Sequence, residues 1–287
     1  MGTSPLLSDD PELVPPPPPF VGRLGLLDGP AKGIWCADSG GNGPAVILLH
    51  AHTGAAESWA YQQHALADAG FRAIAYSRRG AGLSPAPEGA RGDMEDLIAV
   101  LDALGVARAH IVGIAAGGFI GSRAVVAMAA RVASFTLCCS MGGMTAPDIQ
   151  ARIAATQPHE FHELPVELRE LSPSYRFANP EGVARWMDVY RTSLSVRLSS
   201  LPPETRTAMR KLATQGGPPI ETVAASGVPM HLIYGDADLY APSALARMLA
   251  RRLGNARVTT IAEAGHSANW EMPRTFNAAM LSFLAAQ

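Results

Sequence analysis

A histidine and an aspartate in the last fifth of the chain are the residue types best suited to acid–base chemistry. His266 lies in residues 264–267 (Ala-Gly-His-Ser) and Asp238 in residues 235–238 (Gly-Asp-Ala-Asp), and each segment follows a predicted strand. A carboxylate that keeps one imidazole nitrogen protonated leaves the other nitrogen as a base. If the fold brings the two side chains together, they could therefore activate a water molecule or take a proton from a substrate.

A glycine-rich turn at residues 113–118 (Gly-Ile-Ala-Ala-Gly-Gly) joins a predicted strand to a predicted helix. In such a turn the side chain at the sharpest point is pushed above the sheet, and its neighbours must be small because strand and helix pack closely. Ala115 takes that exposed point. Glycine-rich strand–helix turns also bind phosphate. Here, however, no lysine of a phosphate-binding loop follows, and the first glycine turn of a dinucleotide-binding fold would lie nearer the amino terminus.

The elements that must position these residues alternate between strands and helices from residue 20 onward. Short apolar runs such as residues 45–50 are typical of strands buried on both faces, and amphipathic stretches such as residues 93–104 are typical of helices. Repeated strand–helix units predict a mostly parallel central sheet flanked by helices on both faces. The predicted strands are residues 21–27, 33–37, 45–50, 71–76, 110–113, 134–140, 228–234 and 257–261, and the predicted helices are residues 58–69, 93–104, 117–130, 243–252 and 270–285.

Three regions are expected from this pattern. Residues 1–19 form a disordered, proline-rich tail, since the run from Pro15 to Pro19 favours extended polyproline II, and a plain spacer is the preferred interpretation over a ligand for a proline-binding partner. Residues 20–141 and 226–287 form the α/β core. Residues 142–225 interrupt the alternation with helical patterns and no convincing strand, so we expect a helical cap over the edge of the sheet where open α/β sheets bind ligands.

Five motifs in this order resemble those of the α/β-hydrolase fold superfamily. Residues 50–54 (His-Ala-His-Thr-Gly) look like its oxyanion loop, usually His-Gly-x-x-Gly, and residues 76–84 look like its Asp-x-Arg-Gly-x-Gly-x-Ser loop. The glycine-rich turn at residues 113–118 looks like the family's nucleophile elbow, and it is followed along the chain by the Asp238 loop and the His266 loop. The resemblance covers residues 20–287 and is closest to the capped single-domain branch of enol-lactonases, carbon–carbon bond hydrolases, esterases and haloperoxidase-like enzymes. It implies the α/β-hydrolase fold with a helical cap insertion.

The resemblance also implies catalytic roles. His266 takes the histidine position of the family's triad, and Asp238 takes the acid position, because the family's acid lies three residues after the glycine. Asp236 is then expected to cap or brace the turn. Ala115 stands at the nucleophile position in place of the family's serine. A methyl group cannot attack a carbonyl, so no acyl-enzyme can form there.

The remaining site residues are also expected from the resemblance. The oxyanion-hole donors would be the backbone N–H groups of Ala116 and of His52 or Ala51. Ser140 and Thr53 could bind substrate or water but lack the geometry of the elbow. Arg78 and Arg79 could neutralise an acidic substrate, although the family's arginine usually braces its loop. The candidate substrate-binding residues are His50, Thr53, Ser140 and, in the cap, Trp186.

Composition narrows the possible partners and the compartment. Hydrophobic residues make up 48% of the 287 residues, and the net charge is −2 with no long basic run, which argues against nucleic acid as a partner. The lack of an apolar stretch of about 18 residues argues against a membrane span, and the amino terminus does not resemble a secretory signal. Three cysteines without zinc-type spacing fit a reducing cytoplasm. We expect a cytoplasmic monomer or homodimer that takes a small-molecule substrate without cofactor or metal.

Three functions are compatible with an alanine at the elbow. The leading one is an enzyme acting on an ester, a lactone or a β-diketone, in which His266, oriented by Asp238, activates water or the substrate. Decarboxylation or isomerisation of an enolisable substrate also fits this arrangement. The second is an inactive Ser→Ala variant of an ordinary serine hydrolase, and the third is a binding protein that has kept the pocket and lost catalysis.

Overall fold

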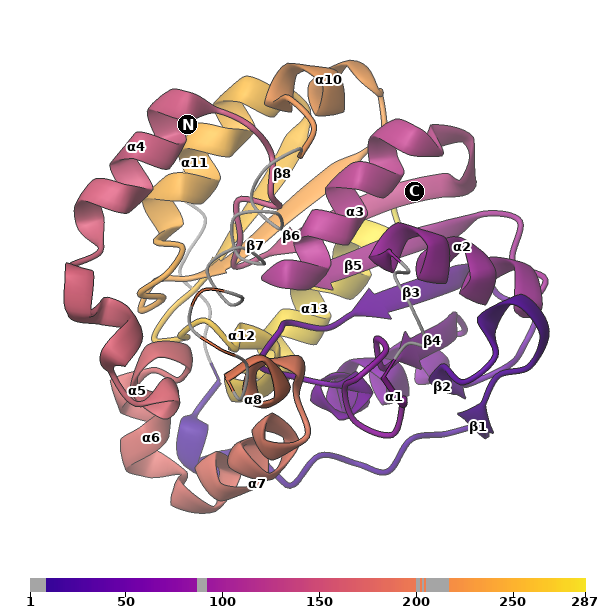
Figure 1. The fold of residues 1–287 in the computed structure, drawn as a ribbon, viewed down its shortest axis with the longest axis horizontal. Helices are drawn as coiled ribbons and strands as arrows, with labels where there is room; N and C mark the ends of the chain where they lie inside the picture. The colour runs from indigo at the N-terminus through magenta and orange to yellow at the C-terminus, as the bar shows by residue number, and fades with distance from the viewer. Residues whose placement is uncertain (1–8, 87–91, 200–201, 203, 205–216) are drawn as a thin grey trace.

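The computed structural model, which describes residues 9–86, 92–199, 202, 204 and 217–287, contains one sheet of eight strands (Figure 1). The strand order is β1-β2-β4-β3-β5-β6-β7-β8; β2 runs antiparallel to both of its neighbours, and all other pairs are parallel. The mostly parallel sheet predicted from the sequence is confirmed. The strands are β1 (Arg23–Leu26), β2 (Trp35–Asp38), β3 (Ala45–Leu49), β4 (Arg72–Tyr76), β5 (Ala109–Ile114), β6 (Val132–Cys138), β7 (Met230–Gly235) and β8 (Ala256–Ile261).

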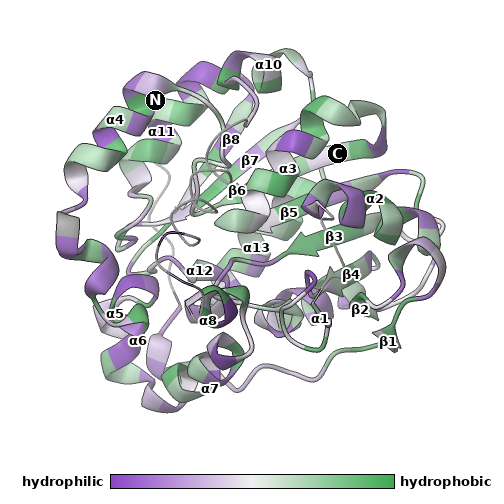
Figure 2. Cartoon of the chain, viewed as in Figure 1, coloured by the Kyte–Doolittle hydropathy of each residue, from purple (hydrophilic) through white to green (hydrophobic). Residues whose placement is uncertain are grey.

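The central strands are apolar because both of their faces are covered. All five residues of β3 are buried. Successive side chains of a strand point to opposite faces, and accordingly Val46 and Leu48 pack in one hydrophobic cluster while Ile47 and Leu49 pack in the other. In Figure 2 the central strands are mainly hydrophobic and the outer helices mix hydrophobic with hydrophilic residues.

Helices cover both faces of the sheet. One cluster joins the strands to α2 (Asp93–Ala103), α3 (Ala116–Ala127), α10 (Ile220–Ala225) and α11 (Ser243–Leu253). The other joins them to α1 (Ala60–Asp68), α12 (Ala268–Glu271) and α13 (Pro273–Leu284). The short 3₁₀ helices outside the region between β6 and β7 are η1 (Pro11–Leu13), η2 (Gly29–Ala31), η3 (Ala56–Trp59) and η4 (Ala129–Arg131).

The predicted elements differ from the observed ones mainly at their ends. The helix expected over residues 270–285 is divided into α12 and α13, and Pro273 begins the second helix. Proline has no N–H to donate to the preceding turn, so it is tolerated in the first turn of a helix and breaks one elsewhere. The helix expected over residues 58–69 likewise begins as the 3₁₀ turn η3 before α1.

An inserted helical region between β6 and β7 lies over the carboxyl edge of the sheet (Figure 1). Hydrogen bonds from α5 and α7 to the loops of that edge hold it in place. Ile220 and Val223 of α10 belong to the sheet's own hydrophobic cluster, so the end of the insertion already packs on the core. The other helices of the insertion are α4 (Pro147–Thr156), η5 (His159–Glu163), α5 (Val166–Glu170), α6 (Pro173–Ala178), α7 (Pro180–Arg191) and α8 (Leu194–Ser199).

Residues 9–19, which the sequence predicts as part of a disordered tail, make hydrogen bonds with the rest of the chain, whereas residues 1–8 lie outside the described part of the chain. This segment runs past α6 and α7 to β1 (Figure 1). The Asp9 carboxylate accepts hydrogen bonds from the backbone of Arg274 and Thr275, at 2.8 Å and 2.9 Å. Asn179 donates to two carbonyls of the segment, at 3.1 Å and 3.2 Å. Side chains of this kind supply hydrogen-bond partners for the N–H and C=O groups of an extended backbone, and amino-acid composition does not reveal them.

Within the described residues, no helix combines the length and the apolarity that crossing a bilayer requires.

The glycines of the elbow allow α3 to approach the sheet closely. A methyl group added at Gly117 would lie 2.1 Å from the carbonyl oxygen of Leu49, and one added at Gly113 would lie 2.6 Å from the carbonyl oxygen of Gly117. Both contacts are with backbone, which cannot rotate away. The small residues of this turn are therefore required by packing, independently of any chemistry at Ala115.

We predict that Gly117→Ala lowers the free energy of unfolding by about 3 kcal/mol, because the added methyl group overlaps the backbone of β3. Urea denaturation followed by circular dichroism measures the loss. The matched control is Gly92→Ala, since nothing lies within 4 Å of a methyl group there; it should change the free energy of unfolding by less than about 1 kcal/mol. Equal free energies of unfolding for the two variants would contradict the close approach of α3 to β3.

Candidate active site

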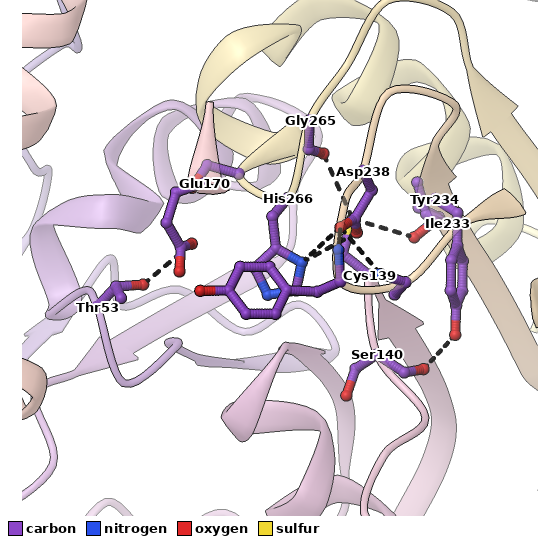
Figure 3. Close-up of polar contacts among 12 residues, drawn as sticks. Thr53, Cys139, Ser140, Glu170, Ile233, Tyr234, Asp238, Gly265 and His266 are labelled. Atoms are coloured by element: carbon purple, nitrogen blue, oxygen red, sulfur yellow. Dashed lines mark hydrogen bonds and ion pairs between the residues drawn. The ribbon is translucent and has the colours of Figure 1, made fainter. Parts of the chain in front are cut away.

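The structure brings His266 and Asp238 together at the carboxyl edge of the sheet (Figure 3). The imidazole Nδ1 lies 3.0 Å and 2.9 Å from the two carboxylate oxygens of Asp238. The same carboxylate accepts hydrogen bonds from the backbone N–H groups of Tyr240 and Ala241, at 2.8 Å and 3.0 Å. Because a carboxylate only accepts, Nδ1 is assigned the proton, and Nε2 is the nitrogen left for chemistry. Asp236 instead accepts a backbone hydrogen bond of 2.6 Å from the loop after β8, and thus braces the turn.

Burial and nearby carboxylates together set the protonation of His266. Burial alone would lower the pKa of His266, but the negative charges of Asp238, Glu170 and Glu271 outweigh it and raise the pKa to about 9. An opposite charge within a few ångströms favours the charged form of a group. The imidazole is therefore a cation at neutral pH and becomes a base as the pH rises through about 9.

Ala115 occupies the sharp turn between β5 and α3, with φ of 49° and ψ of −114°. Its N–H donates to the carbonyl of Cys138 at 3.0 Å, and its own carbonyl accepts from the N–H of Gly118 at 3.0 Å. A positive φ costs a non-glycine residue about 1–3 kcal/mol, so the packing around the turn must hold it. Ala116 begins α3, and the first N–H groups of a helix have no partner within the helix. Its N–H is therefore suited to stabilising an oxyanion.

The loop after β3 carries the other candidate donors. His50 is fully buried; its Nδ1 donates to the carbonyl of Ala51 at 2.7 Å, and its Nε2 accepts from the N–H of Arg78 at 2.9 Å. Both ring nitrogens of His50 are therefore bonded to backbone groups, and a role of His50 in binding substrate stays a prediction. Burial and the charge of Arg78 lower the pKa of His52 to about 3, and its carbonyl accepts from the N–H of Ser195 in α8 at 3.0 Å.

A small cavity lies beside His266, between the edge of the sheet and the inserted helices α5 and α7. About 10 Å³ of it is open to the centres of water molecules, which is room for about one. Four of the sequence-predicted residues line this cavity, namely His266, Ala51, Thr53 and Trp186. The other six do not line it, namely Asp238, Ala115, Ala116, His50, His52 and Ser140.

Ser140 and Ser122 are placed by local hydrogen bonds away from the cavity. The Ser140 hydroxyl accepts from the N–H of Gly142 at 2.9 Å, and its carbonyl accepts from the hydroxyl of Tyr234 (Figure 3). The Ser122 hydroxyl donates to the carbonyl of Gly118 at 3.1 Å, inside α3. Neither serine lines the cavity beside His266.

Glu170 is a residue of the site that sequence reasoning missed. It is the last residue of α5 and is only 3% exposed. Its Oε2 accepts a hydrogen bond from the Thr53 hydroxyl at 3.2 Å, and its carboxylate lines the cavity together with His266 (Figure 3). Burial raises the pKa of Glu170, and the charge of His266 opposes that rise. No periodicity or motif in the inserted helices distinguishes this glutamate from its exposed neighbours.

Glu271 is a second buried carboxylate that sequence reasoning missed. It accepts hydrogen bonds from the N–H of Gly265 at 3.1 Å and from the N–H of Ser172 at 2.8 Å. The first lies in the histidine loop and the second in the insertion, so Glu271 ties the two together. Burial raises the pKa of Glu271 to about 7.

The basic residues after β4 support the core. Arg78 lies 3.4 Å from the carboxylate of Asp93, and Arg79 lies 3.0 Å from that of Asp96. Neither arginine lines the cavity. In the part of the chain that the structure describes, no three His, Cys, Asp or Glu side chains form a group that could hold a metal ion.

Comparisons with known proteins agree with the observed fold. A family model described as "Alpha/beta hydrolase family" matches residues 46–279. A 2-hydroxy-6-oxononadienedioate/2-hydroxy-6-oxononatrienedioate hydrolase of Burkholderia vietnamiensis is 28% identical over 283 residues, covering 90% of this chain and 92% of that protein. The enol-lactonase of Burkholderia xenovorans superposes with a TM-score of 0.70 at 25% identity, covering 92% of this chain and 100% of that one. A hydrolase from Pseudomonas aeruginosa superposes with a TM-score of 0.71 at 24% identity, covering 92% and 98%.

We predict that His266 titrates near pH 9 and that Asp238→Asn lowers this pKa by about 1–3 units, because the variant removes the negative charge bonded to Nδ1. Histidine NMR signals followed against pH measure both values. His52 and His231 are internal references, since burial lowers the pKa of each to about 3 and both should stay neutral throughout. A His266 pKa below 6.5 in the unmodified protein would contradict the charge arrangement.

Proposed function

Because the chain belongs to the alpha/beta hydrolase family, we propose that it is a hydrolase of small carbonyl substrates such as esters, lactones or β-diketones. The observation that carries this proposal is the His266–Asp238 pair beside a cavity with room for about one water molecule. The relatives support a carbonyl substrate, since their names are those of a lactonase and of a hydrolase of oxo diacids.

The attacking group in this proposal is water. The side chain of Ala115 has no nucleophilic atom, and in a serine hydrolase loss of the nucleophile lowers turnover about a million-fold. His266 instead removes a proton from water through Nε2 while Asp238 holds Nδ1 protonated. Since the pKa of His266 is about 9, the reaction should accelerate as the pH rises toward that value.

Charge that develops on the carbonyl oxygen would be stabilised by backbone donors. The N–H of Ala116, at the start of α3, faces the edge of the sheet where the loop after β3 also ends. Ala51 lines the cavity and His52 does not, so Ala51 is the preferred second donor. Removing one such donor from an oxyanion hole typically costs a factor of about 10²–10³ in turnover, and a backbone donor is unaffected by the identity of the side chain.

A binding protein without turnover is the second candidate. The observations that favour it are Ala115 itself and the raised pKa of His266, which keeps the imidazole cationic at neutral pH. Such a protein would bind the same small carbonyl compounds and release them unchanged.

We predict that His266→Ala reduces turnover by about a hundredfold or more, because it removes the proposed base. A screen of small esters, lactones and β-diketones against the unmodified protein identifies the substrate for this comparison. His64→Ala is the control, since that histidine lies on the surface of α1 and pairs with Asp68. Full turnover in the His266 variant would rule out the proposed mechanism.

A different outcome is expected for Ala115→Ser. A serine hydroxyl would compete with the attacking water, so turnover of the natural type of substrate should fall several-fold while the fold is kept. Steady-state rates, together with a search for a burst of acyl-enzyme, measure the effect. A large rise in esterase activity accompanied by a burst would instead identify the chain as an intact serine-hydrolase frame that lacks only its nucleophile.

A further inference from the structure

We propose that Glu170 makes the site selective for the charge of its ligand, favouring neutral or cationic carbonyl compounds that carry an N–H or O–H donor and rejecting carboxylates. For turnover this inference rests on the proposed function, whereas its test by binding does not. A site that binds dicarboxylic substrates would place cations around the ligand, and the proposed selectivity is the opposite of that.

The position of Glu170 is fixed from two sides. Its backbone carbonyl accepts from the N–H of Ser267, next to His266, at 3.0 Å. Its Oε2 accepts from the Thr53 hydroxyl at 3.2 Å. Oε1 has no hydrogen-bond partner among the described residues. One carboxylate oxygen is therefore held in place, and the other remains to accept from a ligand group about the size of the one water molecule for which the cavity has room.

Negatively charged groups outnumber positively charged groups around the cavity. Glu170 and His266 both line the cavity, and the carboxylates of Asp238 and Glu271 also act electrostatically on His266 without lining it. The charge of Arg169 also acts on Glu170, but the guanidinium donates to the carbonyl of Leu164 and to the hydroxyl of Tyr240. Of the described residues that line the cavity, none is a lysine or an arginine.

A ligand carboxylate would therefore be a further anion in a site where Asp238, Glu170 and Glu271 already surround a single imidazolium. Like charges in a buried site repel strongly because little water screens them. A ligand amide, hydroxyl or ammonium group would instead donate to Glu170 and relieve the burial of its charge. The carboxylate of Glu170 thus discriminates between two ligands of equal size that differ only in charge.

Two esters of the same shape test this selection. Methyl succinamate ends in an uncharged amide, and monomethyl succinate ends in a carboxylate. We expect the unmodified protein to bind the amide at least about tenfold more tightly than the carboxylate, as measured by NMR titration or calorimetry. Equal affinities, or an amide that does not bind at all, would overturn the proposal.

The matched variants are Glu170→Gln and Glu163→Gln. Glutamine at position 170 keeps an oxygen for the Thr53 hydroxyl and removes only the charge. The tenfold preference should shrink to within about threefold in Glu170→Gln, chiefly because the carboxylate binds better. Glu163 lies exposed in the same insertion, so Glu163→Gln should keep the full preference. A preference that is unchanged in Glu170→Gln would refute the role of this residue.

A second readout does not depend on ligand binding. If Glu170 is ionised beside His266, Glu170→Gln should lower the pKa of His266 in an NMR titration, although Asp238 and Glu271 still hold it above its ordinary value. An unchanged pKa would mean that Glu170 is neutral in the cavity and that charge selection fails. Failure of the proposed function would look different, because it would appear as full turnover in His266→Ala.

Discussion

An imidazole that is 7% exposed can stay charged only if anions are buried beside it, and this requirement governs the site. Asp238 comes from the loop after β7, Glu170 from α5 and Glu271 from α12, so three separate segments meet around His266. The folded pKa of about 9 lies above the ordinary value of 6.5, so the folded protein binds this proton more tightly than the unfolded chain does. The resulting stabilisation is fully present below about pH 6.5 and is lost as the pH rises through about 9. Catalysis by a neutral imidazole and stabilisation by a charged one therefore prefer opposite ends of the same pH range.

The same requirement explains why the insertion is attached where it is. The carbonyl of Glu170 and the N–H of Ser172 are bonded to the histidine loop and to Glu271, and the indole N–H of Trp186 donates to the hydroxyl of Ser267 at 3.1 Å. The cluster beneath these contacts includes Val14, so the amino-terminal segment supports the insertion as well. Moving the insertion would break these hydrogen bonds and would also displace Glu170, one of the carboxylates that raise the pKa of His266.

The alternation of strands and helices along the chain and the loops that carry chemistry could be predicted because both are encoded locally. A parallel sheet collects the carboxyl ends of its strands at one edge, so Asp238 and His266 were expected to be neighbours once their loops had been assigned. Glu170 and Glu271 could not be predicted, since their role depends on the docking of one segment on another. Charged residues in amphipathic helices are usually exposed, and nothing in the sequence marks these two as exceptions. The contacts of the amino-terminal segment could not be predicted for a related reason. The prolines at 15–19 predict an extended backbone, but they do not show which side chains form hydrogen bonds with the segment.

The turn at Ala115 has the backbone geometry of a nucleophile elbow without a reactive side chain. Ala115 has a positive φ although it carries no reactive atom, and the glycines at positions 113 and 117 allow the close approach of α3 to the sheet on either side of it. A packing requirement therefore preserves the turn whatever side chain stands at its point, and the presence of an elbow says little about activity. Whether the site can carry out a reaction has to be judged from side chains that are not required for packing. A buried carboxylate is costly and is easily replaced by an apolar residue of similar volume. That Glu170 nonetheless lies beside His266 is, in physical terms, stronger evidence of a working site than the elbow itself.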